Sequence, residues 1–170
     1  LSSQYADANV LRPAGIWVSG GELWLRDARI SESRYSGLQL RSFASLHAAG
    51  VLLDHGLYVA LLTAGRRGDA VEVEHRAHGI VVRSGSQATL AGVRSSRMIN
   101  INVLVADIGK INGASNSSLN ATGLLVDSTL AEFSAKRYGI GVLAAAYTKI
   151  RCVSCALVAN RMSSAMVRLG

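Results

Sequence analysis

The chain has 170 residues, of which 49 % are hydrophobic and 17 % are charged, with 17 glycines and one proline. This balance excludes a disordered chain and a coiled coil, and the length suits a single domain with a continuous core. No apolar run approaches the roughly 18 residues of a membrane span, so we expect no membrane insertion. The formal net charge of +7 favours anionic partners, but the basic residues are scattered without interleaved aromatics, so we expect no nucleic acid.

A four-residue pattern, Gly-apolar-x-apolar, recurs about every 21 residues along the chain. Its copies occupy residues 15–18, 37–40, 56–59, 79–82, 100–103, 123–126, 139–142 and, in degenerate form, 164–167. Glycine leads because the chain bends sharply there, often with positive φ, and Asn100 is the best substitute for it. The second and fourth residues of each copy, such as Ile16 and Val18, share one face of a strand and predict a dry interior.

Further strands are expected within each repeat. A second alternating stretch occurs at residues 23–25, 71–74, 88–90 and 150–152, and a weaker third at 28–30 and 157–159. Three short strands per repeat predict an all-β, single-stranded, right-handed parallel β-helix of about eight turns over residues 15–170. Residues 1–14 are then an N-terminal extension or cap, and the start at Leu1 without Met suggests a fragment or processed product. Another β-solenoid and a doubly wound α/β fold are the alternatives, although most segments between copies would make poor helices.

The third residue of each copy should point outward and stack into a column on the surface. Five of the eight are apolar or aromatic, in a column that reads Trp17, Gln39, Tyr58, Val81, Asn102, Leu125, Gly141 and Met166. An exposed apolar column of this length predicts a partner surface, with partial cover by loops as the alternative. We assign it to contacts around the threefold axis of a homotrimer, through Trp17, Tyr58, Val81, Leu125 and Met166.

Four residues are candidates for binding carbohydrate. Trp17 and Trp24 fall on outward positions, and aromatic faces stack on sugar rings, although packing against an N-terminal cap or a neighbouring subunit is the alternative that we favour. Arg41 and Arg83 belong to the next outward column and would suit an anionic glycan, or are simply solvated.

The densest titratable cluster contains the candidate catalytic residues Glu72, Glu74 and Asp69. The two glutamates alternate on one strand with Cα atoms about 7 Å apart, a spacing compatible with the acid and base of a glycosidase. The same pattern is ordinary for a solvated strand, so the sequence does not decide whether the chain is an enzyme. His75 and His78 follow, but nothing fixes them as metal ligands, and we expect no metal and no cofactor.

Cys152 and Cys155 form a single C-x-x-C motif. A structural zinc site normally needs four ligands, and the sequence has no second cysteine pair. We therefore expect two reduced, largely buried thiols.

The turns at residues 123–128, 139–142 and 155–160 resemble the β-helix turns of bacteriophage tailspike and tail-fibre proteins. The resemblance implies a homotrimeric protein of the phage virion that binds host surface polysaccharide and contacts other phage tail proteins. Pectate-lyase-like enzymes and secreted bacterial adhesins share this style of turn. A polysaccharide depolymerase, either glycoside hydrolase or lyase, and a non-enzymatic adhesin that is secreted or on the bacterial cell surface are therefore the alternatives. The resemblance carries over no catalytic residue.

Overall fold

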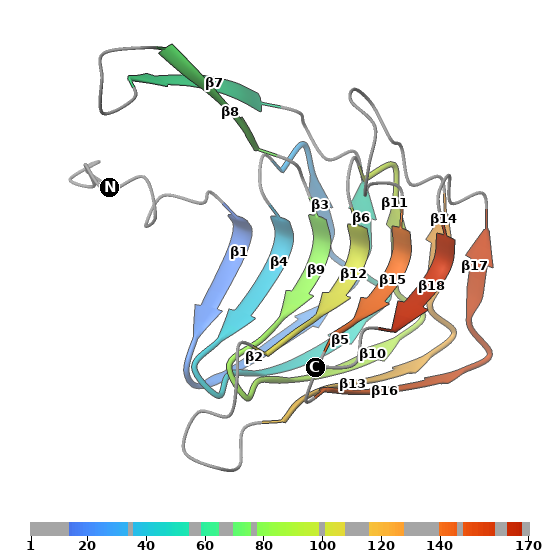
Figure 1. Cartoon of the computed structure of the whole chain (residues 1–170). Coiled ribbons are helices and arrows are strands. Elements are labelled where there is room, and N and C mark those ends of the chain that lie inside the picture. Colours follow the sequence, from blue (N-terminus) through green and yellow to red (C-terminus); the bar gives the residue numbers. More distant parts are fainter. Residues whose placement is uncertain are drawn as a thin grey trace.

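All but two of the strands in the computed structural model stack into three parallel sheets that run side by side along the molecule (Figure 1). The structure describes residues 14–33, 36–54, 59–64, 70–75, 78–98, 101–107, 116–127, 140–145, 148–158 and 163–167. Every regular element within these ranges is a strand, and none of their segments is a helix long and apolar enough to cross a membrane. The predicted all-β parallel fold is confirmed at this level.

Each turn of chain contributes one strand to each sheet in succession. The first sheet contains, in spatial order, β1 (Ala14–Ser19), β4 (Ser36–Arg41), β9 (His78–Val82), β12 (Ile101–Val105), β15 (Ile140–Ala144) and β18 (Ser163–Val167). The second contains β2 (Glu22–Arg26), β5 (Ser45–Ala49), β10 (Gln87–Ala91), β13 (Ser117–Thr122) and β16 (Thr148–Val153). The third contains β3 (Arg29–Ser31), β6 (Leu52–Asp54), β11 (Arg94–Ser96), β14 (Leu125–Asp127) and β17 (Ala156–Val158).

Inward side chains of successive turns lie directly above one another and form the core. In the first sheet Leu38 is in register with Ile80, and Ile80 with Val103, and all three are essentially inaccessible to solvent. The buried aliphatic side chains of all three sheets form one continuous cluster. Stacked branched side chains of this kind fill most of the narrow interior, as the alternating pattern predicts, and the buried Ser95 adds a hydroxyl group that donates to Asn102 Oδ1.

The leading glycines are required by close packing. A Cβ on Gly15 would lie 2.7 Å from Ile30 Cγ2, closer than carbon atoms approach. A Cβ on Gly79 would overlap Ser95 Oγ and the Asn102 carbonyl oxygen. The expected reason, a positive φ, is therefore wrong for these glycines, because a third-sheet side chain and the carbonyl group of the neighbouring first-sheet strand leave no room for a side chain there.

Positive φ occurs instead in the corners, and most regularly in the corner between the second and third sheets. Five successive turns place a left-handed residue there: Asp27 (φ 49°), Gly50 (62°), Gly92 (57°), Gly123 (64°) and Ser154 (52°). The Gly50 N–H donates to the Ala91 carbonyl, and the Gly92 N–H to the Thr122 carbonyl, both at 2.9 Å. Only glycine, or occasionally Asp, Asn or Ser, adopts this conformation cheaply. Gly123 thus marks a corner, and the prediction that residues 123–126 belong to the main strand column is wrong.

A hairpin interrupts the repeat between the second and third turns. Strands β7 (Val59–Ala64) and β8 (Ala70–His75) pair antiparallel with each other, whereas β4 pairs directly with β9. Residues 71–74 therefore form a hairpin strand and not a second-sheet strand. In all, the described residues make five three-strand turns and a sixth first-sheet strand, where the pattern predicted about eight turns.

The register of the last turns differs from the prediction by two residues. Val103 lies opposite Ile80, so Asn102, and not Asn100, is the residue beside Gly79. Ile101 and Ile140 accordingly leave the main core and form a separate apolar cluster with Leu143.

Candidate functional site

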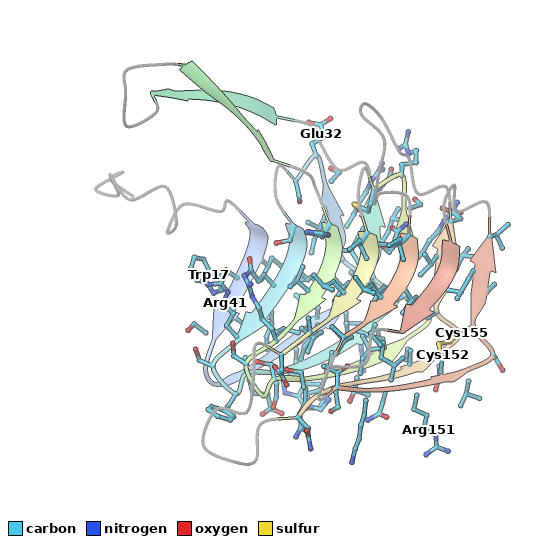
Figure 2. The ribbon with its side chains drawn as sticks, in the orientation of Figure 1. Trp17, Glu32, Arg41, Arg151, Cys152 and Cys155 are labelled. Carbon is cyan, nitrogen blue, oxygen red and sulfur yellow. A yellow bond between two sulfur atoms is a disulfide. The ribbon has the colours of Figure 1, made fainter. Side chains whose placement is uncertain are left out.

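The outer face of the second sheet carries an exposed row of side chains that runs along the stack. We call it the central column, and it consists of residues in register on successive strands: Trp24, His47, Thr89, Asn120 and Arg151. Their neighbours along each strand point into the core, since side chains alternate across a strand. Four steps at the ~4.8 Å strand spacing make the row roughly 19 Å long. Arg151, at its far end, points away from the sheets (Figure 2).

The near end of the central column is aromatic. Trp24 is 69 % exposed, and its indole stacks on the His47 ring with centroids 4.0 Å apart and planes 15° apart. His47 Nε2 lies 3.0 Å from Glu22 Oε1. Glu22 therefore positions the imidazole of His47, and the imidazole packs against one face of the Trp24 indole and orients it. The indole presents a flat apolar surface to solvent.

An open groove of about 350 Å³ runs beside this aromatic pair. The side chains of Trp24, His47 and Thr89 line it on the side of the central column. Ala49 and Ala91, in the adjacent column, line the other side. Their small side chains leave open space there, which forms the groove. The remaining lining residues are Leu25, Arg26 and Ala48. The groove thus combines a flat aromatic surface with a hydroxyl group and a guanidinium.

The other three carbohydrate candidates lie together on the first sheet. The Arg41 guanidinium lies 5.1 Å from the centroid of the Trp17 ring, and the two are neighbours in Figure 2. With its amide oriented to suit its neighbours, Gln39 accepts hydrogen bonds through its oxygen from Arg41 Nε (2.6 Å) and from Arg83 Nη2 (2.5 Å). The structure therefore separates Trp24 from the other three candidates. Arg41 makes a cation–π contact with Trp17, and Arg41 and Arg83 are joined through Gln39, to which both donate.

The predicted interface residues do not form one column. Leu125 lies on β14 in the third sheet, and Val81 is only 2 % exposed within a single chain. The column that contains Trp17 continues through Gln39, Val81, Leu104, Leu143 and Met166. Tyr58 lies outside the described residues, as does the side chain of Met166. The first-sheet column therefore offers less exposed apolar surface than the pattern predicted.

The candidate catalytic glutamates lie on the inserted hairpin. Glu72 and Glu74 are on β8, opposite Leu62 and Ala60 of β7, while Asp69 lies outside the described residues. The side chains of both glutamates, and that of His75, also lie outside the part of the chain that the structure describes, so their catalytic role stays a prediction. Within the described ranges, no group of three or more His, Cys, Asp or Glu side chains is arranged to hold a metal ion.

An ion-pair network on the outer face of the third sheet was not predicted. We call it the Asp–Arg network, and it comprises Arg29, Asp54, Arg94, Ser96, Arg97 and Asp127. Asp54 accepts hydrogen bonds from Arg97 Nε (2.8 Å) and Nη2, Arg29 Nη2 (3.2 Å) and Ser96 Oγ (3.2 Å). The hydrogen bond from Arg97 is the main cause that holds the pKa of Asp54 at about 2, against the opposing effect of burial.

The same network extends one pair further along the sheet. Arg94 Nη2 donates to Asp127 Oδ2 at 2.6 Å, and a pocket of about 270 Å³ lies between the two ion pairs. The sequence does contain a signal for this network. In two turns an aspartate directly follows two apolar residues, in Leu-Leu-Asp at 52–54 and in Leu-Val-Asp at 125–127. Because each aspartate pairs with an arginine, we interpret the network as a structural bond between turns.

The two cysteines form a disulfide, so the expected pair of reduced thiols is wrong. Cys152 and Cys155 are linked with Cα atoms 5.9 Å apart, across the left-handed corner at Ser154 (Figure 2). Cys152 lies opposite Ala121 and so continues an inward column of the second sheet. Disulfides persist in oxidising environments such as the cell exterior, the periplasm and the virion surface.

No protein-family model, curated protein or solved structure matches this chain. Its class therefore rests on the architecture: an all-β protein whose parallel strands stack in three sheets, as in a parallel β-helix.

Proposed function

We propose that this protein is a right-handed parallel β-helix that binds surface polysaccharide on the outer face of its second sheet. Right-handed crossings are the general rule for parallel strands joined within one sheet, which supports the handedness. The observation that carries the function is the exposed indole of Trp24, held by His47 beside an open groove.

The chemistry of the face suits sugars. A pyranose ring has an apolar face that loses water against an indole, while its hydroxyl groups need hydrogen-bond partners around the rim. Thr89 and Asn120 are exposed and follow Trp24 in the same column, and they provide a hydroxyl and an amide. An extended sugar chain advances by about one strand spacing per pyranose, so successive sugars would meet successive turns.

The wider setting is part of the same proposal. The resemblance of the turns to tailspikes and tail fibres supports a homotrimer in a phage virion, attached to other tail proteins and contacting host polysaccharide. A secreted or cell-surface adhesin is another candidate, and the Cys152–Cys155 disulfide is compatible with both settings, because such bonds persist on virions as well as on cell surfaces.

The test compares Trp24→Ala with Phe43→Ala, which removes another exposed aromatic from a corner away from the groove; Phe43 is 63 % exposed. Binding to immobilised bacterial surface polysaccharides is measured, with far-UV circular dichroism to verify folding. Trp24→Ala should weaken binding about 10-fold, equivalent to about 1.4 kcal/mol, and Phe43→Ala should leave it unchanged. Equal affinity of wild type and Trp24→Ala would overturn the proposal.

A depolymerase on the same fold is distinguished by product formation. The double variant Glu72→Gln/Glu74→Gln should abolish release of reducing ends or unsaturated sugars if these residues are the acid and base. Cleavage that survives both changes would contradict the assignment of these glutamates.

A further inference from the structure

We propose that the polysaccharide is acidic and lies along the central column, with Lys149 and Arg151 binding its negatively charged groups. This inference rests on the proposed function, since it names the ligand class of the same face. Two observations carry it: the distribution of charge on the second sheet, and the register of the column.

The outer face of the second sheet has an excess of cations. Arg26, Lys149 and Arg151 are exposed there, and Glu22 is the one carboxylate on the outer positions of these five described strands. Glu22 is already engaged by His47. In the part of the chain that the structure describes, the three cations have no ion-pair partner.

The neighbours of the two terminal cations are neutral. On the adjacent strand β13, Lys149 lies opposite Ser118, and Arg151 lies opposite Asn120. The third sheet provides the contrast, because there the arginines of the Asp–Arg network each face an aspartate of a neighbouring turn. The arginines that link turns in the third sheet are thus neutralised by aspartates. The cations of the second sheet have no such partner among the described residues and can bind an external anion.

The spacing of the cations fits a polymer and not a single sugar. Lys149 and Arg151 are two residues apart on β16, so their side chains leave the same face about 7 Å apart. Trp24 lies at the opposite end of the straight column, roughly 19 Å from Arg151. A chain of several sugars would cover this length, stacking one ring on Trp24, passing Thr89 and Asn120, and ending with a carboxylate between the two cations. A guanidinium binds such a carboxylate through two parallel hydrogen bonds, so the interaction depends on geometry as well as on charge.

The experiment measures binding of the intact chain to polygalacturonate, hyaluronan and polysialate, each compared with its carboxyl-reduced, neutral form. The variants are Lys149→Gln/Arg151→Gln and Trp24→Ala. The control Arg29→Gln/Arg94→Gln removes the same net charge from the third sheet. Circular dichroism shows that each variant is folded, and a single-stranded DNA oligonucleotide of similar charge tests for general attraction to polyanions.

The proposal expects at least one acidic polymer to bind more tightly than its neutral form. Lys149→Gln/Arg151→Gln should lower that affinity about 10-fold and leave binding of the neutral form unchanged, and the advantage should shrink in high salt. The third-sheet control should bind like wild type, and DNA should bind more weakly than the acidic polysaccharide.

Other results would overturn the inference in distinguishable ways. If Trp24→Ala weakens binding but the neutral forms bind as well as the acidic ones, the acidic ligand is wrong and the proposed function stands. If Trp24→Ala has no effect, or no polymer binds, the proposed function fails as well. If DNA binds equally well and both double variants weaken it alike, the face is only a general attractor of polyanions.

Discussion

Among the described residues, Asp54 is the carboxyl group through which acid should weaken this protein. The pKa of Asp54 is lowered from 3.8 to about 2, first by the hydrogen bond from Arg97, with the charges of Arg97 and Arg29 assisting. A carboxyl whose pKa is lower in the folded state stabilises the fold at pH values above its unfolded pKa. That contribution should therefore be complete above about pH 4 and should disappear as the pH falls toward 2.

The size of the effect follows from the two pKa values. The difference between 3.8 and about 2 is equivalent to about 2.4 kcal/mol of unfolding free energy. Arg29 and Arg97 are 64 % and 52 % exposed, so solvent screens their interaction with Asp54. We therefore expect a contribution of about 1–2 kcal/mol.

The assay is urea unfolding, followed by circular dichroism, at a series of pH values from 7 to 2 for wild type and Asp54→Asn. The variant should be less stable by about 1–2 kcal/mol at pH 7, and the two should converge as the pH approaches 2. A double-mutant cycle with Arg97→Gln should assign most of the coupling to this pair. If wild type and Asp54→Asn lose stability in parallel below pH 4, Asp54 is not the carboxyl group that controls the acid stability.

Three further predictions concern the packing of the turns. Gly79→Ala should destabilise the fold by about 1–3 kcal/mol in thermal or urea unfolding, because its Cβ has no space beside Ser95; an unchanged midpoint would contradict the steric role of the glycine column. Leu53→Ala, at a fully buried site, should cost about 2–5 kcal/mol, and a loss below about 1 kcal/mol would mean that the third sheet packs loosely. Breaking the disulfide with Cys152→Ser should cost about 2 kcal/mol, close to the effect of reducing wild type; if dithiothreitol does not change the melting temperature, Cys152 and Cys155 are not linked in solution.

The sequence predicted the interior of the fold better than its outside. Pairs such as Leu38/Leu40 and Ile80/Val82 were correctly assigned to the core, because branched aliphatic residues that alternate along a strand share one face and bury it. The prediction for Gly123 was wrong because glycine occurs at two kinds of position in this fold. It is needed where a Cβ would clash, and it is also needed where φ is positive. Only the pairing of strands separates these cases.

The candidate site was predicted in part for a related reason. Trp24 was correctly placed on an outward position, since the leucines on either side point inward. Its partner His47 could not be predicted, because that contact depends on the register between two strands that are far apart in sequence. The same holds for Asp54 and Arg97, whose hydrogen bond joins residues of neighbouring turns.

The hairpin formed by β7 and β8 has a consequence for engineering. Residues 55–77 lie between β6 and β9, yet β4 pairs with β9 in the same parallel register as the uninterrupted turns. This corner therefore accommodates a long inserted segment without a change in the pairing of the strands on either side. Replacing the hairpin with an epitope, an enzyme or a second binding module would turn the protein into a display scaffold, with the passenger on a corner that contributes no strand to the three sheets.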